Sequence, residues 1–396
     1  MGIYIFDRKI QKNKNTGYDM TFKPNVFLTS NVFSALEIGS NENISVNVRN
    51  GIKKLWQELD QISVLKIFNG RFPSEDQINK NIKKFKPDII GCHLSHSLSS
   101  EILENSEVFA ISTSTAGYNH IQKTIKDDII ITHTPGILHE TVADYTIAII
   151  MTSLRNLVEL HNYIWDNLWT LDDKWDLDQS LSSVITGKVL GIVGLGEIGK
   201  ELIRRLYSWG IKILYYDIKQ MNDFEQDYPS IEFKENLEDV FRDSDIVSIH
   251  VPLNKHTEKM VNRDLLKLMK KNALLVNTAR GPILDLETLL EMLETDEIQI
   301  NLAFDVFPIE PLDKKTLERL KNIKQQRPEI RMILIPHNAS ADADTRGKMN
   351  ILFLQDIISL IKSSSLEDLN KIHIIPDHKK QLEDKEWRIF NYWEKK

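Results

Sequence analysis

The chain has 396 residues, of which 41% are hydrophobic, and this is enough material for more than one hydrophobic core. Its formal net charge of −7 gives no general attraction to nucleic acid or to an anionic membrane, so neither is expected as a partner. The single cysteine, Cys92, excludes an intrachain disulfide and argues against a cysteine-ligated metal site.

The amino-terminal segment, residues 1–23, reaches a charged residue early and lacks the apolar region of a signal peptide. The longest apolar candidate for a membrane span, residues 147–151, is too short to cross a bilayer. Together with the single cysteine, these features favour a location in the reducing cytoplasm. We interpret residues 1–23 as a terminal extension.

Short apolar runs alternate with helical patterns in the first third of the chain, which is typical of a parallel α/β architecture. Helical stretches near residues 51–59 and 76–86 separate the first three runs. The predicted strands are residues 26–28, 64–68, 88–91, 108–111 and 129–131. We therefore predict a doubly wound domain whose first part covers residues 24–135.

Pro135 and Gly136 interrupt this pattern, and a long apolar helix is predicted after them, from Val142 to about Asn162. A second series of predicted strands follows at residues 189–193, 211–216, 246–249, 273–276, 300–304 and 332–335. We place a domain crossing near residue 135 and a second doubly wound domain over residues 136–337. The amphipathic stretch 345–361 is predicted to return to the first domain, so residues 338–365 are assigned to it.

The charged segment 366–396 is interpreted as a second terminal extension. It carries four large aromatic side chains, Trp387, Phe390, Tyr392 and Trp393. They would pack either on a neighbouring molecule or on the chain's own surface, and the sequence leaves that choice open.

A glycine-rich turn follows the strand predicted to end at residue 193 and precedes a helical stretch. Its sequence is Gly194-Leu195-Gly196-Glu197-Ile198-Gly199, in the strand–turn–helix context that a dinucleotide site needs. Gly194 would allow the tight turn, Gly196 would let the backbone approach a pyrophosphate, and Gly199 would let the helix pack closely on the strand. The sequence therefore predicts a Rossmann dinucleotide site at this turn, including Glu197 and Ile198.

The next predicted strand ends at Asp217. A carboxylate at this place accepts a hydrogen bond from a ribose 2′-hydroxyl and repels a 2′-phosphate, so it favours NAD over NADP as the cofactor. Lys219, two residues later, is the one feature that would weaken this preference. The alternative interpretation is an aspartate that only caps the turn after its strand.

Polar side chains follow three later strands, at the sheet edge where open α/β sheets bind their ligands. Arg280 offers a planar fork that can bind a carboxylate through two hydrogen bonds. His337 can protonate a carbonyl oxygen, and Glu310 can hold the imidazolium that exchanges this proton. Taken singly, each has an ordinary alternative: a surface ion pair, a structural histidine, or the end of a loop.

These segments together resemble the D-isomer-specific 2-hydroxyacid dehydrogenase family, over roughly residues 24–360. The resemblance rests on several motifs that occur in the family's order. They are His250-Val251-Pro252-Leu253, Asn277-Thr278-Ala279-Arg280-Gly281, Asp305-Val306-Phe307, Glu310-Pro311 and Pro336-His337. The resemblance implies a flavodoxin-like substrate domain and a Rossmann NAD-binding domain with a cleft between them.

The resemblance also implies roles for individual residues. Arg280 would bind the substrate, His337 would be the acid/base, and Glu310 would be its partner. Asp305 would touch the nicotinamide side of the NAD. Further cofactor contacts are implied for Thr141, Val251, Pro252, Thr257, Thr278 and Ala279.

On the substrate side, the segment Ser114-Thr115-Ala116-Gly117-Tyr118-Asn119-His120 resembles the family's substrate loop. The backbone amides of Ala116 and Gly117 would hold the substrate carboxylate. His93 or His96 is assigned a contact with the substrate, His93 being the preferred one, with ordinary loop packing as the alternative. No metal site is expected, because no carboxylate cluster accompanies His93 and its neighbour His96. The resemblance implies a homodimer formed through the nucleotide domain.

The predicted function is hydride transfer between NAD(H) and a small 2-hydroxy or 2-keto acid, with D specificity implied by the resemblance. Asn119 and the pair Leu302-Ala303 depart from the family's usual residues and leave the identity of the acid open. Two alternatives use the same fold: oxidation of formate or phosphite, and a non-catalytic NAD(H)-sensing corepressor or scaffold. The first is disfavoured because an amide is expected where Glu310 stands. The second is disfavoured because Arg280 and His337 are present as well.

Overall fold

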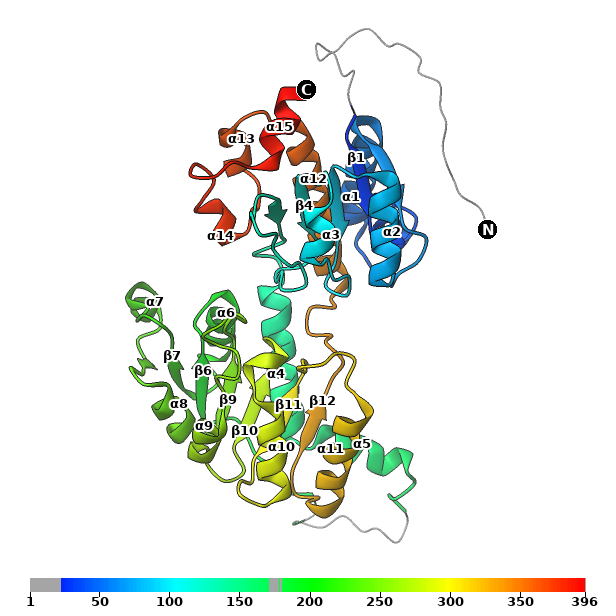
Figure 1. Cartoon of the computed structure of the whole chain (residues 1–396). Helices are drawn as coiled ribbons and strands as arrows, with labels where there is room; N and C mark the ends of the chain where they lie inside the picture. The colour runs from blue at the N-terminus through cyan, green and yellow to red at the C-terminus, as the bar shows by residue number, and fades with distance from the viewer. Residues whose placement is uncertain (1–22, 171–177, 179, 396) are drawn as a thin grey trace.

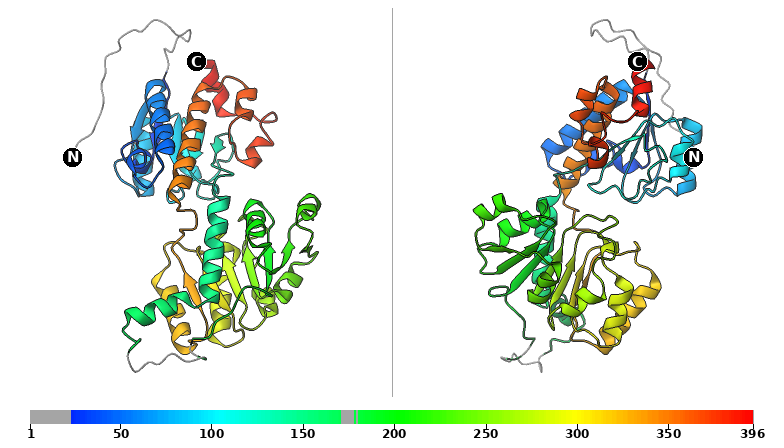
Figure 2. Two further views of the ribbon diagram at one scale, coloured as in Figure 1. Left: turned by 180° about the vertical axis from the view of Figure 1, so that it is seen from behind. Right: turned by 60° about the vertical axis from the view of Figure 1, so that its left-hand side comes forward.

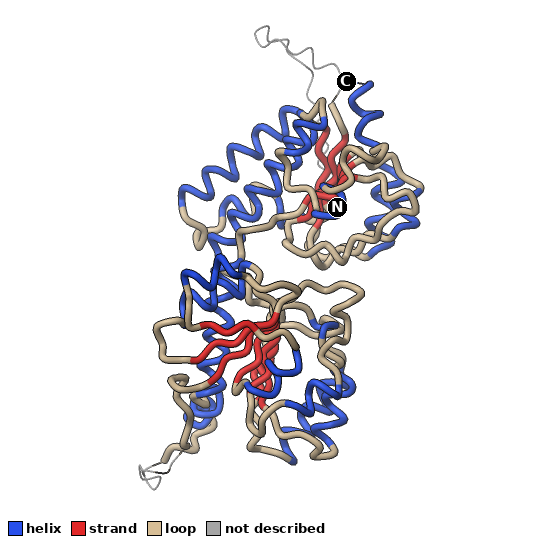
Figure 3. Tube along the Cα trace, turned by 90° about the vertical axis from the view of Figure 1, so that its left-hand side faces the viewer, coloured by secondary structure: helices blue, strands red, loops and turns tan. Residues whose placement is uncertain are grey.

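The computed structural model describes residues 23–170, 178 and 180–395 of the chain. The proposed extension at residues 1–23 therefore lies outside the described residues, apart from its last member. The described residues form two lobes, each built on its own parallel sheet (Figure 1). The strands of each lobe run through its centre, with helices and loops around them (Figure 3).

The first lobe contains a sheet of five parallel strands within the described residues, in the order β2-β1-β3-β4-β5. This is the flavodoxin-like strand order, and it confirms the first doubly wound fold. The strands are β1 Asn25–Leu28, β2 Val64–Ile67, β3 Ile89–Cys92, β4 Ala110–Thr113 and β5 Ile130–Thr132. The helical segments are η1 Asn31–Phe33, η2 Ile38–Ser40, α1 Val46–Ile62, α2 Glu75–Phe85 and α3 Ser100–Glu104.

Helix α12, Ala343–Lys362, returns from the second lobe and packs on the first. It approaches α1 so closely that a Cβ on Gly347 would lie 2.5 Å from Cγ1 of Val48. Phe353 of α12 is fully buried and stacks on Phe33 with ring centroids 4.6 Å apart. The apolar face predicted for this stretch is therefore covered by the first lobe.

The second lobe contains seven parallel strands within the described residues, in the order β12-β11-β10-β9-β6-β7-β8. The strands are β6 Val189–Val193, β7 Lys212–Tyr216, β8 Ile231–Phe233, β9 Ile246–Ile249, β10 Leu274–Asn277, β11 Asn301–Phe304 and β12 Met332–Leu334. The sequence order reverses between β6 and β9, which is the point where Rossmann sheets bind dinucleotides. The second doubly wound fold is thus confirmed as well.

Helices cover both faces of this second sheet (Figure 2). They are α4 His139–Leu154, α6 Glu197–Leu206, α7 Asn222–Asp227, α8 Leu237–Asp243, α9 Arg263–Leu268, α10 Leu286–Glu294 and α11 Lys314–Gln326, with the short η3 at Gly281–Ile283. Helix α4 runs from the junction of the lobes down into the second one. The residue numbers assigned to the domain boundaries stay a prediction.

The prediction of one continuous helix from Val142 to Asn162 is wrong. Helix α4 ends at Leu154, and a separate helix, α5 Leu157–Trp165, begins after Asn156. Asn156 has a φ of 55°, a left-handed conformation that no helix interior contains and that asparagine tolerates better than most residues. Strand β8, a three-residue strand at the sheet edge, was not predicted.

The carboxyl-terminal segment packs on the first lobe of its own chain. It contains α13 Leu366–Asn370, α14 Pro376–Lys379 and α15 Arg388–Lys395. Trp387 and Tyr392 are buried, and the Tyr392 ring stacks on Phe109. Ile374 forms an antiparallel bridge with Thr132 of β5, so the segment covers the edge of the first sheet.

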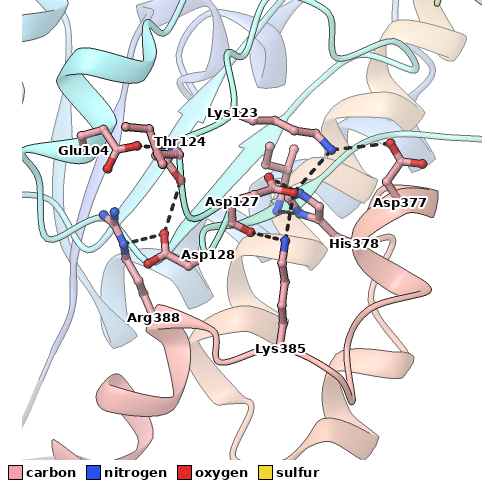
Figure 4. Close-up of polar contacts among 11 residues, drawn as sticks. Glu104, Lys123, Thr124, Asp127, Asp128, Asp377, His378, Lys385 and Arg388 are labelled. Carbon is pink, nitrogen blue, oxygen red and sulfur yellow. Dashed lines mark hydrogen bonds and ion pairs between the residues drawn. The ribbon is translucent and has the colours of Figure 1, made fainter.

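Ion pairs fix this segment to the loop that precedes β5 (Figure 4). The His378 ring and the Lys385 ammonium group both lie 3.0 Å from the carboxylate of Asp127. Arg388 pairs with Asp128 at 2.9 Å. The polar residues of the segment therefore reinforce the contact that its aromatic side chains make.

Among the described residues, no helix combines the length and the apolar character that crossing a membrane would need.

Candidate active site

The glycine-rich turn joins β6 to α6 at the switch point of the second sheet. Gly194 has a φ of 96°, and a Cβ there would lie 2.8 Å from Cγ1 of Val251. A Cβ on Gly199 would lie 2.6 Å from the Gly194 carbonyl oxygen, so only glycine lets α6 approach the turn this closely. Gly196, in contrast, faces open space, and no side chain caps the amino terminus of α6. An anion can therefore approach the free N–H groups of this helix end.

Asp217 lies at the carboxyl end of β7 beside this turn. One oxygen of its carboxylate accepts a hydrogen bond from the Leu195 N–H at 2.7 Å, and the other accepts from the Ile218 N–H at 2.7 Å. The aspartate thus fixes the turn while its charge remains at the strand end. Glu197 and Ile198 form the first turn of α6, where Glu197 is exposed and pairs with Lys200.

The predicted cofactor residues after β9 lie in one loop next to the glycine-rich turn. Val251 packs so closely on Gly194 that its Cγ1 would lie 2.8 Å from a Cβ added there. The Thr257 hydroxyl donates a hydrogen bond to the Pro252 carbonyl at 2.6 Å and accepts one from the Asn254 N–H. The loop is therefore closed on itself, with Val251 against the turn.

Two further predicted cofactor residues lie at the amino-terminal half of α4 and at the end of β10. Thr141 shares a hydrogen bond of 2.7 Å with Thr345 of α12, which joins the first turns of the two helices. Thr278 shares one of 3.0 Å with Thr146 of α4. The Ala279 N–H is held by the Asn277 side chain at 3.0 Å.

Arg280 directly follows this group, and its backbone is fixed from two sides. The Asn277 side chain donates to the Arg280 carbonyl at 3.0 Å. A Cβ on the next residue, Gly281, would lie 1.9 Å from the carbonyl carbon of Phe307, so glycine alone permits this contact between two loops. The Arg280 guanidinium donates to its neighbour's carbonyl, on Ala279, at 2.7 Å. Among the described residues it has no ion-pair partner.

An unpaired and largely buried guanidinium is costly unless a ligand supplies the missing charge. Burial lowers the pKa of Arg280, and the charge of Glu310 partly opposes this effect. A carboxylate that bound Arg280 through two hydrogen bonds would compensate the buried charge. The arrangement therefore fits the predicted recognition of an acid.

His337 and Glu310 form a hydrogen-bonded pair, with Nδ1 of the ring 2.6 Å from Oε2 of the carboxylate. Oε1 of Glu310 accepts from the Phe307 N–H at 2.9 Å, which fixes the carboxylate group. Burial alone would raise the pKa of Glu310, but the hydrogen bonds from His337 and Phe307 and the charge of Arg280 lower it. The carboxylate is thus ionised at neutral pH and holds Nδ1 as a donor, which leaves Nε2 available for another partner.

Asp305 is buried, and it holds the loop that carries His337. Its two carboxylate oxygens accept from the N–H groups of Asn338 and Ala339, at 2.7 Å and 2.9 Å. Its own carbonyl accepts from the His337 N–H at 2.8 Å. The structure therefore gives Asp305 a supporting role for His337, and its predicted contact with the nicotinamide stays a prediction.

The predicted substrate loop of the first lobe lies against Arg280 of the second. A Cβ on Gly117 would lie 2.1 Å from Nη2 of Arg280, so the loop and the guanidinium are in direct contact across the lobes. Asn119 of the same loop donates to the Leu253 carbonyl at 3.4 Å. Ala116 and Gly117 therefore lie beside the residue that was predicted to bind the same carboxylate.

His93 is half-buried, and its ring lies 3.9 Å from the ring of His96, measured between centroids. Burial, with the nearby charges of His96, His120 and Arg346, lowers the pKa of His93 to about 3. His96 is fully buried, and both its ring nitrogens have partners, at Thr29 and the Arg71 carbonyl. The structure therefore explains His96 as a structural residue and leaves the substrate contact of His93 a prediction.

Sequence reasoning assigned no role to several residues that support the site. His120 closes the substrate loop, its Nε2 lying 3.1 Å from the Thr113 hydroxyl, and burial lowers its pKa to about 4. His133 contacts the same loop from β5, and Asn277 fixes the segment around Arg280. Asn277 ends β10 and His133 directly follows β5, so these two share the signal of a polar residue at the carboxyl end of a parallel strand, whereas His120 lies in a turn and does not carry it. That position alone does not separate a supporting residue from one that contacts the ligand.

No group of three or more histidine, cysteine, aspartate or glutamate side chains with metal-binding geometry occurs in the described part of the chain.

Comparison with known proteins identifies the family. The family profile described as D-isomer specific 2-hydroxyacid dehydrogenase, NAD binding domain, matches residues 147–339. The glyoxylate reductase of Thermofilum pendens is 35% identical over 319 residues, covering 77% of this chain and 90% of that protein. The glyoxylate reductase of Korarchaeum cryptofilum is 34% identical over 291 residues, covering 72% and 83%.

Solved structures agree with the fold. A glyoxylate reductase from Paecilomyes thermophila has a TM-score of 0.70 at 22% identity, covering 90% of this chain and 99% of that one. A D-lactate dehydrogenase from Aquifex aeolicus, complexed with NAD and lactic acid, has a TM-score of 0.66 at 21% identity, covering 89% and 98%. At these identities the likeness establishes the architecture.

The chain belongs to the D-isomer specific 2-hydroxyacid dehydrogenase family. It is an NAD-dependent oxidoreductase that transfers hydride between the cofactor and a small 2-hydroxy or 2-keto acid.

Proposed function

We propose that this enzyme reduces glyoxylate, or a 2-keto acid of similar size, with NADH. The observation that carries the proposal is Arg280, a guanidinium without an ion-pair partner among the described residues, which lies against Gly117 and near the Glu310–His337 pair. The identity of the acid is supported by the names of the relatives, several of which are glyoxylate reductases at 31–36% identity.

In this proposal each residue has one task. Arg280 binds the substrate carboxylate, together with the backbone N–H groups of Ala116 and Gly117. This fixes the 2-carbonyl oxygen towards Nε2 of His337, which donates a proton to it. Glu310 holds Nδ1 and stabilises the charged ring before the proton leaves. Bound NADH supplies the hydride that reduces the carbonyl carbon.

The residues of the second lobe fit NAD. Gly196 leaves open space at the uncapped amino terminus of α6, where a pyrophosphate would accept backbone hydrogen bonds. Asp217 would accept from the ribose hydroxyls and disfavour a 2′-phosphate. The roles of Val251, Thr278 and the other cofactor residues belong to this proposal. A cytoplasmic location does too, and it rests on the single buried cysteine.

The test is a comparison of 2-keto acids with the purified chain. Oxidation of NADH is followed with glyoxylate, hydroxypyruvate, pyruvate, phenylpyruvate and 3-phosphohydroxypyruvate, and then with NADPH in place of NADH. We expect the highest kcat/KM with glyoxylate and a clear preference for NADH. A higher kcat/KM for phenylpyruvate or the phosphorylated acid would overturn the proposed substrate. Tight NADH binding without turnover of any acid would instead support the sensor or scaffold alternative.

We further propose that the enzyme is a homodimer joined through the second lobe. Helix α5 has no buried residue, and Ile164, Trp165 and Trp169 on and after it are all more than half exposed. Exposed apolar patches of this kind mark interaction surfaces. We expect a dimer by sedimentation velocity at micromolar protein and a monomer for Trp165→Asp. Ile125→Asp, at an exposed apolar residue of the first lobe, should remain dimeric. A monomeric wild type would contradict this proposal.

A further inference from the structure

His133 lies at the carboxyl end of β5, between the substrate loop and the carboxyl-terminal segment. His133 is 9% exposed, and Nδ1 of its ring lies 2.8 Å from the carbonyl oxygen of Ala116. A carbonyl oxygen only accepts hydrogen bonds, so Nδ1 must carry the proton. Burial lowers the pKa of His133, although the hydrogen bond to Ala116 opposes this, and the ring is therefore neutral at neutral pH.

The backbone of the substrate loop is held through three successive carbonyl groups. The Thr115 carbonyl accepts from the Thr134 N–H at 3.0 Å, and the Ala116 carbonyl accepts from His133. The Gly117 carbonyl accepts from the Thr115 hydroxyl at 2.6 Å. Two adjacent residues at the end of β5 thus hold two adjacent peptide groups of the loop.

Because the peptide bond is planar, the carbonyl groups that are held in place also fix the directions of the N–H groups that follow them. In a trans peptide the carbonyl of one residue and the N–H of the next point in opposite directions. Because Thr134 holds the Thr115 carbonyl, the Ala116 N–H points away from β5. Because His133 holds the Ala116 carbonyl, the Gly117 N–H also points away from β5. Neither N–H donates a hydrogen bond to another described residue. Gly117 itself lies against the Arg280 guanidinium.

We propose that His133 is a positioning residue, whose side chain fixes the Ala116–Gly117 peptide so that the Gly117 N–H points to the substrate carboxylate beside Arg280. This inference rests on the proposed function, because it concerns the same carboxylate. It assigns the orientation of this peptide to the hydrogen bond from His133, the side chain that holds the Ala116 carbonyl within the described part of the chain.

The carboxyl-terminal segment holds His133 from the other side. The His133 N–H donates to the His373 carbonyl at 3.0 Å, next to the bridge between Thr132 and Ile374. His373 is fixed in turn by Asp356 of α12, its Nδ1 lying 2.9 Å from the carboxylate. The ion pairs in Figure 4 fasten the same segment to the loop before β5. His133 therefore occupies a fixed place from which its ring can orient the loop.

Two substitutions of His133, whose side chains branch at the same atom, separate a positioning role of its ring from a packing role. Asparagine carries an N–H donor at the atom that corresponds to Nδ1, and leucine has the same branching without any donor. We expect His133→Leu to raise the KM for glyoxylate about tenfold or more, with the KM for NADH unchanged. This is the effect of losing one hydrogen bond to a charged group, here the bond from the Gly117 N–H to the substrate carboxylate. His133→Asn should restore the KM for glyoxylate to within about threefold of the wild type.

Binding of oxamate, a carboxylate that resembles glyoxylate but is not reduced, gives a second measurement on the NADH-loaded enzyme. Its Kd should rise for His133→Leu and not for His133→Asn. Equal effects of the two variants, or a fall in kcat with no change in the KM for glyoxylate, would overturn the inference. If His133→Leu does not fold, His133→Asp replaces it. Aspartate has the same shape as asparagine, the matched variant, and its carboxylate donates no hydrogen bond at neutral pH. Failure of the proposed function is distinguished beforehand, since the wild type itself would then fail to reduce glyoxylate or would prefer a larger 2-keto acid.

Discussion

Replacing His337 by asparagine is expected to lower kcat for glyoxylate reduction by about 10²–10⁴-fold, the usual contribution of a positioned general acid. The reason is the geometry of its ring: Nδ1 is engaged by Glu310 at 2.6 Å, so only Nε2 can deliver a proton to the substrate oxygen. Asparagine keeps a polar group near the ring position but has no proton to transfer at neutral pH. Steady-state rates with NADH and glyoxylate measure the effect.

The affinity for NADH, followed by the quenching of protein fluorescence, should not change in this variant. Glu310→Gln is the matched second variant, since it keeps the shape of the side chain and removes its charge. It should reduce kcat less than His337→Asn does, because the ring remains and loses only the stabilisation of its charged form. A kcat for His337→Asn within about threefold of the wild type would exclude His337 as the acid.

Replacing Arg280 by glutamine is expected to lower kcat/KM for glyoxylate by about 10²–10⁴-fold, the effect of losing two hydrogen bonds between charged groups. Much of the loss should be a higher KM, since the carboxylate is bound in the ground state as well as in the transition state. The same kinetic assay, extended to high glyoxylate concentration, separates the two parameters.

Arg280→Lys tests whether the shape of the guanidinium matters. Lysine keeps the charge but cannot make two parallel hydrogen bonds, so it should restore only part of the lost activity. Arg263→Gln is a control for the removal of one positive charge, because Arg263 is an arginine of α9 paired with Glu291 and Glu297. Full activity of Arg280→Lys would show that charge alone suffices and would contradict binding through two hydrogen bonds.

The parts of the fold that follow from local physical rules were predictable from the sequence. The strands of both sheets are short apolar runs, and the turn after β6 needs glycine at Gly194 and Gly199 for steric reasons that the structure shows directly. Strand β7, which ends just before Asp217, was predicted from the same pattern. These features depend on residues close together in the chain, so the sequence contains the information in readable form.

Other features depend on contacts between distant residues and were not predicted. The break between α4 and α5 occurs at Asn156, without proline or glycine, inside a run that is apolar on both sides. The aromatic residues of the carboxyl-terminal segment gave no indication of their partner, and Tyr392 meets Phe109 of the first lobe. Their burial depends on the tertiary structure rather than on a periodic pattern.

The residues of the site divide in the same way, into those that a local motif indicates and those that depend on contacts between distant residues. Arg280, Glu310 and His337 were predicted because each follows a strand within a recognisable motif. His133 was overlooked because a histidine at the end of β5 has no motif around it, and its contact with Ala116 spans two separate loops. Asp305 was predicted as a cofactor contact, whereas its visible task is to hold the loop of His337.

The most direct test of the central claim is the transfer of deuterium from NADH to the product. Enzyme is incubated with glyoxylate and NADH labelled with deuterium at the transferable C4 position, and the glycolate formed is examined by mass spectrometry. We predict one deuterium on the 2-carbon of glycolate, with transfer by the His337→Asn variant slower by about 10²–10⁴-fold. Glycolate that forms without deuterium would contradict direct hydride transfer. An enzyme that binds NADH and reduces neither glyoxylate nor any other 2-keto acid would contradict the proposed function itself.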